Sequence, residues 1–137
     1  MRTREDIESY LMRSSLSYKN VHVEDGTEDG MWLVKDVHTE QALVVSVSGP
    51  LLLFRMKVMT LDDVKDKAGL FTQLLQYNAS DMVHGSYGLS DGAVVLTAGL
   101  LLENIDYNEF QGTVDDMTLA LNTHHPNLIC YRGDHAA

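Results

Sequence analysis

ALVVSVSGPLLLFRMKVM, residues 42–59, decides the fold class of this chain, because it places β-branched and other apolar residues on both sides of Gly49-Pro50. Such runs around a Gly-Pro pair are typical of two strands joined by a tight turn. Proline cannot donate to a ladder of hydrogen bonds, so Pro50 is not expected inside a central strand. The stretch predicts two consecutive strands.

Before this pair, the sequence indicates a helix and then a strand. Thr3 and Asp6 have the spacing of a helix-capping pair, and the helical spacing of apolar residues ends near Ser15. Residues 18–23 alternate only weakly between apolar and polar types, whereas residues 31–37 form the first firm strand pattern.

After this pair, Thr60 and Asp63 repeat the capping pattern and predict a central helix that continues to Asn78. Residues 84–89 and 92–103 then predict a hairpin. With a last helix, the order is α-β-β-β-α-β-β-α. We therefore expect one α+β domain over residues 1–137, with a twisted antiparallel sheet of about five strands and three helices.

The last helix is expected from Asp106 to His124, with Pro126 closing it. It begins inside ENIDYNEFQGTVDD, residues 103–116, which is dense in carboxylates. A calcium loop starting at Asp106 would have apolar residues at its ligand positions 5 and 12, so it could not close around the ion. Asp106 and Glu109 are better explained as residues that cap the helix and favour its positive end.

The net charge is −10, and no Lys or Arg occurs between Lys67 and Arg132. Binding to nucleic acid or to an anionic membrane surface relies on clustered cations, so neither is an expected partner. An apolar or basic protein segment suits the surface better. The candidate acidic partner surface comprises Glu103, Asp106, Glu109, Asp115 and Asp116.

Two patterns offer an enzyme as the alternative. GLSDG, residues 88–92, matches the G-x-S-x-G nucleophile motif around Ser90, but that motif needs a strand followed by a helix, and strand-like residues follow here. The 103–116 carboxylates could serve a metal-dependent enzyme. However, Cys130 is the only cysteine, and the six histidines show no His-x-x-x-His pair and no HExxH pattern. His124, at a helix end, is expected to be exposed or to cap the helix, and metal binding by His124 with His135 is the remaining alternative. We expect no enzyme, no cofactor and no metal.

The order of elements, together with WLVKD, LVVSVSGPLLLFRMKV, MVHGSYGLSDGAVVLTAGLLLENIDYNEF and TVDDMTLAL, resembles the YjfI-like family of uncharacterised bacterial proteins. This resemblance implies a cytoplasmic protein whose relatives are encoded near PspA-like membrane-stress proteins. More distantly, the plan is similar to YbjN-like proteins and to type III secretion chaperones. The chaperone likeness implies a homodimer around the central helix, and by position the candidate dimer face comprises Phe71, Leu74, Leu75, Val94 and Leu96.

The charged, helix-patterned N-terminus and the short apolar run at 93–102 also favour a cytoplasmic protein without a membrane span. We therefore expect a small acidic module that binds or regulates another protein, chaperone-like and dimeric. An apolar or basic segment of the partner would lie on an exposed strand edge or groove.

Overall fold

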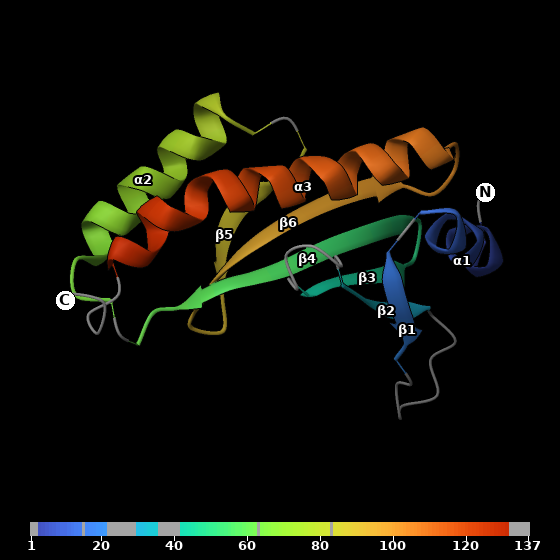
Figure 1. Cartoon of the computed structure of the whole chain (residues 1–137), viewed down its shortest axis with the longest axis horizontal. Helices are drawn as coiled ribbons and strands as arrows, with labels where there is room; N and C mark the ends of the chain where they lie inside the picture. Colours follow the sequence, from blue (N-terminus) through green and yellow to red (C-terminus); the bar gives the residue numbers. More distant parts are fainter. Residues whose placement is uncertain are drawn as a thin grey trace. The chain divides into compact units, whose positions relative to one another are not determined.

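The computed structural model describes residues 3–14, 16–21, 30–35, 42–62, 64–82 and 84–131 (Figure 1). In order, its elements are α1 (Arg4–Arg13), β1 (Ser17–Asn20), β2 (Met31–Lys35), β3 (Ala42–Ser48), β4 (Leu51–Thr60), α2 (Lys67–Ser80), β5 (Ser86–Ser90), β6 (Ala93–Leu101), α3 (Tyr107–Leu128) and the short 3₁₀ helix η1 (Ile129–Tyr131).

The described strands form one six-stranded sheet in the order β1-β2-β3-β4-β6-β5. The pairs β1–β2, β2–β3, β3–β4 and β5–β6 are antiparallel, which confirms the predicted α+β class and the strand pair on either side of Gly49-Pro50. The sheet has one strand more than expected, because Ser17–Asn20 pairs with β2. That strand reads SYKN and lies at an edge, where few side chains need to be apolar, so its pattern was weak.

The chain divides into two compact units, and each is described by itself. The first comprises residues 1–56 and 98–112, and the second comprises residues 57–97 and 113–137. By these bounds, β4, β6 and α3 each contribute residues to both units. The expectation of one domain stays a prediction.

The core of the first unit lies against one face of its strands. Phe54 of β4 and Tyr10 of α1 each contact the ring of Phe110, with centroids 5.7 Å apart in both pairs. The indole of Trp32 is fully buried and donates from Nε1 to Glu8 of α1, at 3.2 Å. Both α1 and the first turn of α3 therefore pack on the same face of the sheet.

The start of α1 is as predicted. The Asp6 amide donates to the Thr3 hydroxyl, and the Asp6 carboxylate accepts from the Thr3 amide at 2.8 Å, which is a complete capping box. The helix ends at Arg13, with Ser14 as its C-cap, slightly before the predicted end.

The predicted start of the central helix is wrong. Strand β4 continues to Thr60, and α2 begins only at Lys67, with Asp66 as its N-cap. The Asp66 carboxylate accepts from the Gly69 amide at 3.0 Å, so it satisfies one of the unpaired N–H groups at the helix start. Asp63 lies outside the described residues.

The capping prediction for the last helix is confirmed, but its predicted end is wrong. Asp106 Oδ1 accepts from the Glu109 amide at 2.8 Å, and the Asp106 carbonyl accepts from the Phe110 amide at 3.1 Å. The helix then continues to Leu128 with Pro126 inside its last turn. A proline so close to the end removes one backbone hydrogen bond, which the helix tolerates there. None of the described helices is long and apolar enough to cross a membrane.

Candidate partner-binding surfaces

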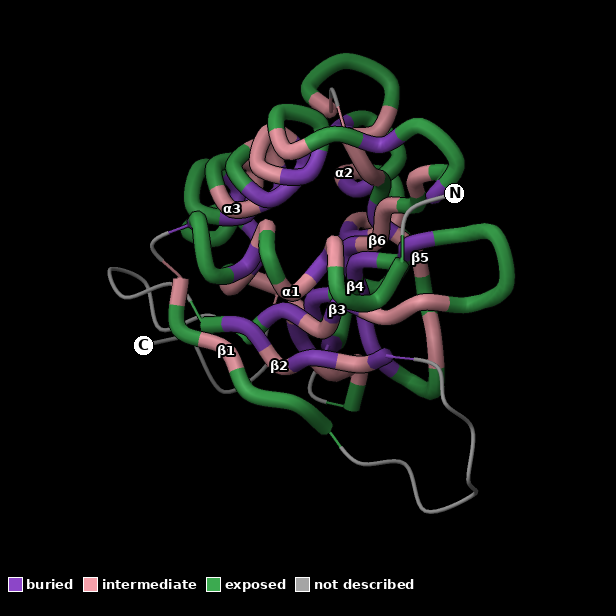
Figure 2. The backbone as a smooth tube through the Cα atoms, turned by 90° about the vertical axis from the view of Figure 1, so that its right-hand side faces the viewer, coloured by how far each residue is buried: buried purple, intermediate pink, exposed green. Residues whose placement is uncertain are grey.

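In the first unit, buried and partly exposed residues alternate along the strands (Figure 2). Trp32, Val45 and Phe54 face the core and are almost fully buried. Their neighbours in sequence point to the opposite side, where they stay partly or largely exposed. We call this side the open face, and its residues are Ser17, Lys19, Met31, Leu33, Lys35, Ala42, Val44, Ser46, Ser48, Leu51, Leu53 and Arg55.

Cross-strand pairing arranges the open face in rows. Lys19 lies opposite Leu33, Leu33 opposite Val44, and Val44 opposite Arg55. This row therefore has a cation at each end and two apolar side chains between them. The row beside it runs through Met31, Ser46 and Leu53, so the apolar centre continues along the strands.

In the second unit, α2 and the edge strand β5 enclose an apolar groove of about 210 Å³. Leu75 is 68% exposed and Leu89 is 53% exposed, so the groove has apolar rims open to solvent. Its lining is formed by Phe71, Leu74, Leu75, Asn78, Tyr87, Gly88 and Leu89.

Three of the five residues of the candidate dimer face, Phe71, Leu74 and Leu75, line this groove. Val94 and Leu96 do not share that surface, because both are fully buried within the chain. The burial corrects their assignment, since β6 lies between β4 and β5 in the sheet and its apolar side chains there serve the core.

The Asn78 side chain ties α2 to β5. Its Nδ2 donates to the Tyr87 carbonyl at 3.1 Å, and its Oδ1 accepts from the Tyr87 amide at 2.7 Å. The Asn78 side chain thus makes the two hydrogen bonds to the Tyr87 backbone that a neighbouring strand would otherwise make at this edge of the sheet. The backbone of β5 beyond Tyr87 is where a further strand could pair.

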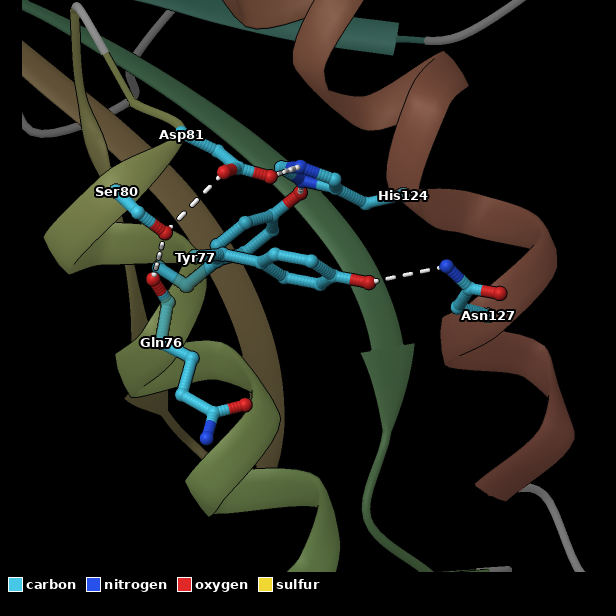
Figure 3. A network of polar contacts seen from close by, with 7 residues as sticks. Gln76, Tyr77, Ser80, Asp81, His124 and Asn127 are labelled. Atoms are coloured by element: carbon cyan, nitrogen blue, oxygen red, sulfur yellow. Dashed lines mark hydrogen bonds and ion pairs between the residues drawn. The ribbon is translucent and has the colours of Figure 1, made fainter.

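Beside the groove, a buried polar cluster centres on His124 (Figure 3). The imidazole is 3% exposed and joins the Tyr87 hydroxyl, 2.8 Å from Nδ1, to the Asp81 carboxylate, 3.0 Å from Nε2. Because a carboxylate only accepts, Nε2 carries the proton and Nδ1 accepts from the Tyr87 hydroxyl in the neutral imidazole. Burial raises the pKa of Tyr87 well above its ordinary value, and Tyr77 and Asp81 add to the rise.

The expected exposure of His124 is therefore wrong. Because α3 continues past it, His124 lies inside the helix and extends the buried stripe of Val114, Met117 and Leu121 at helical spacing. This helical spacing could have predicted the burial of His124, but the expected helix end at His124 kept the residue from being counted with the buried stripe. His135, the other residue considered for a metal with His124, lies outside the described residues.

A second cavity of the same unit, about 320 Å³, lies beside Asp81 and His124. Leu119 and Asp116 also line it, and the Asp116 carboxylate forms an ion pair with His84 if that imidazole is protonated. These contacts connect the segment after α2 to α3.

The candidate acidic partner surface does not lie within one unit. Glu103, Asp106 and Glu109 are exposed residues of the first unit, whereas Asp115 and Asp116 belong to the second. Asp106 is engaged as the N-cap of α3 and Asp116 contacts His84, and Glu109 and Asp115 also have contacts within the chain.

The enzyme alternative lacks the expected geometry at Ser90. Asp91 and Gly92, at φ values of 51° and 75°, form the turn between β5 and β6, and Ser90 pairs with Ala93 across it. Both central residues have the positive φ of a hairpin turn, so the serine stands before a strand instead of a helix. Among the described residues, no group of three or more His, Cys, Asp or Glu side chains is placed to hold a metal ion.

The chain belongs to the CesT_Tir_1 family of type III secretion chaperone-like proteins, whose family profile matches residues 1–134. No curated protein sequence matches it.

Two solved structures share the fold. One is a chain of the heterodimeric ExoU–SpcU complex from the type III secretion system of Pseudomonas aeruginosa, with a TM-score of 0.57 and 19% identity over 93% of this chain and 98% of that one. The other is a chain of the ExsC–ExsE complex, with a TM-score of 0.54 and 17% identity over 93% of this chain and 97% of that one.

Proposed function

We propose that this protein is a chaperone-like module that binds a polypeptide segment of a partner protein and carries out no reaction of its own. The observation that carries the proposal is the open face, on which Leu33 and Val44 remain partly exposed and Leu53 is 36% exposed in a folded sheet. Family membership supports the proposal. The two similar structures support it as well, because both are complexes of two different proteins.

The physical argument is the state of the two sheet faces. The core face is closed by Trp32, Phe54 and the helices that pack on it, whereas the open face presents apolar side chains from β2, β3 and β4. A contiguous apolar surface of this kind is typical of a protein-binding site. Burial of each of these side chains stabilises a complex by roughly 25 cal/mol per Å² of apolar area removed from water.

The apolar groove between α2 and β5 supports a second contact, with another copy of the chain. Leu75 and Leu89 are the most exposed apolar side chains of that region, and β5 is an edge of the sheet. We propose that a homodimer forms there and leaves the open face for the partner. We also place the protein in the cytoplasm, and a PspA-like protein is one candidate partner.

Site-specific photo-crosslinking in the source organism tests the proposed function. A benzophenone amino acid replaces Leu53 on the open face, and in a matched control it replaces Met12, which is 71% exposed on α1. We expect a defined adduct with one partner protein from position 53 and none from position 12. Equal labelling from both positions, or no adduct from position 53, would contradict the proposal.

A second variant shows that the adduct depends on the surface. Val44→Asp places a carboxylate at the centre of the open face, beside Leu33 and Arg55. Provided that its unfolding transition matches that of the parent chain, the variant should lose the adduct from position 53.

A further inference from the structure

The charges on the open face are opposite in sign to those of the whole chain. The chain carries 20 Asp and Glu against 10 Lys and Arg. Strands β1–β4 contain no Asp or Glu at all, yet they contribute Lys19, Lys35 and Arg55 to the open face. All three residues are exposed, and Arg55 also has a contact within the chain. The strands of the first unit therefore place positive charge on a surface whose other strand residues are apolar or uncharged.

The position of the cations defines a strip of specific width. Lys19 and Arg55 stand at the two ends of one cross-strand row, with Leu33 and Val44 between them. Three strand separations of about 4.8 Å place the backbones of Lys19 and Arg55 about 14 Å apart. An α-helix with its side chains is about 10–12 Å wide, so one helix fits between them along the strands.

We propose that the open face binds an acidic amphipathic helix of the partner protein, an inference that rests on the proposed function. The apolar stripe of that helix lies on Leu33, Val44 and the neighbouring Met31 and Leu53. Its Asp and Glu residues, on both sides of the stripe, reach Lys19 and Arg55. Lys35, further along β2, meets a carboxylate in the next turn.

The cations on the open face, and not the net charge of −10, determine which charge the partner helix should carry. At physiological ionic strength the Debye length is about 8 Å, so exposed carboxylates beyond that distance are largely screened. A carboxylate at the edge of the strip instead lies within contact distance of a lysine or arginine. The open face thus selects the opposite charge from the basic segment that composition alone predicts.

Two synthetic peptides test the inference with the purified full-length chain. Each is a helix of about five turns, roughly 18 residues, with one stripe of leucines. One peptide carries Glu on both flanks of the stripe, and the other carries Lys at the same positions. We expect fluorescence anisotropy to show binding of the Glu peptide at least ten-fold tighter than that of the Lys peptide, with affinity falling as salt rises.

Charge reversal on the open face should reverse the preference. Lys19→Glu with Lys35→Glu should weaken the Glu peptide at least ten-fold and strengthen the Lys peptide. Lys65→Glu with Lys67→Glu changes the net charge by the same amount at two exposed positions after β4, and it should leave both affinities within two-fold. Amide shifts on binding of the Glu peptide should fall on β1–β4.

Other outcomes would overturn the inference. Equal affinities, tighter binding of the Lys peptide, or binding of vesicles rich in anionic lipid without binding of the Glu peptide each exclude an acidic helix as the occupant. The proposed function survives these results if position 53 still forms its partner adduct. It fails separately if the Glu peptide binds but no partner adduct forms.

Discussion

The imidazole of His124 stacks on the phenol ring of Tyr77, with centroids 3.6 Å apart and planes 6° from parallel. This contact joins the buried side of α3 to α2. The Tyr77 hydroxyl also accepts a hydrogen bond from Asn127, one helical turn further along α3, at 3.3 Å (Figure 3). The two helices are therefore held together by an aromatic stack with polar contacts at its rim.

Replacement of His124 should destabilise the chain. His124→Ala removes the stack and leaves the buried Tyr87 hydroxyl without its imidazole partner, at a cost of about 2–3 kcal/mol in the free energy of unfolding. His125→Ala, at an exposed neighbouring position, should change it by less than about 0.5 kcal/mol. Urea unfolding of both variants measures the difference, and equal effects would contradict a structural role for the cluster.

Tyr87 should make stability fall in alkaline solution. Its pKa is raised in the folded chain from an ordinary value of 10.0, so the folded state keeps a proton that the unfolded state releases. The contribution is fully present below pH 10 and is lost as the pH rises toward the folded pKa. The absorbance of ionised tyrosine should show that Tyr87 ionises only as the chain unfolds.

Tyr87→Phe supplies the control for that titration. The variant should lose the late ionisation and show a weaker fall in stability above pH 10, because no hydroxyl remains to titrate. Tyr131 lies outside this buried cluster, so Tyr131→Phe should leave the late ionisation in place. A late ionisation that persists in Tyr87→Phe would contradict the assignment.

Two glycines in helices should respond to alanine in opposite directions. A Cβ at Gly69 would lie 2.2 Å from Asp66 Oδ2, so Gly69→Ala displaces the N-cap of α2 and should cost about 1 kcal/mol. A Cβ at Gly112 of α3 would have no heavy atom within 4 Å apart from its neighbours in sequence and the backbone of its own helix, so Gly112→Ala should stabilise the chain by about 0.5–1 kcal/mol. Thermal unfolding of the pair tests both signs, and the same sign for both would refute the cap argument.

The fold could be predicted largely from local patterns. Thr3 with Asp6 gave a correct helix start, and the residues around Gly49-Pro50 gave two correct strands. The errors fall where a local signal is ambiguous. Thr60 and Asp63 have the spacing of a helix-capping pair, but Thr60 is the last residue of β4, because the strand continues in the sheet up to that position. Pro126 signals a stop but is tolerated in a last helical turn.

The surfaces were harder to predict than the elements. Sequence patterns mark which side chains are apolar, but Val94 and Leu96 are buried only because β6 is an inner strand, which depends on the strand order. The row from Lys19 to Arg55 joins residues 36 positions apart through three strand registers. No local window contains that information, so composition pointed to acidic residues while the open face carries the cations.

Self-association should depend on the groove between α2 and β5. In a symmetric dimer the same face meets itself, so Leu75→Asp places two carboxylates near each other and removes an apolar contact from each copy. Sedimentation velocity should show a dimer for the parent chain and a monomer for Leu75→Asp, with unchanged secondary structure because Leu75 is 68% exposed.

Leu119→Asp is the matched control, because Leu119 is 67% exposed on α3 and lines the cavity beside Asp81 and His124 in the same unit. It introduces the same charge at a similar exposure and should leave the dimer intact. Leu89→Asp, on the opposite rim of the groove, should dissociate the dimer as Leu75→Asp does. A parent chain that sediments as a monomer at every concentration, or equal dissociation by Leu119→Asp, would show that the groove does not hold a second copy.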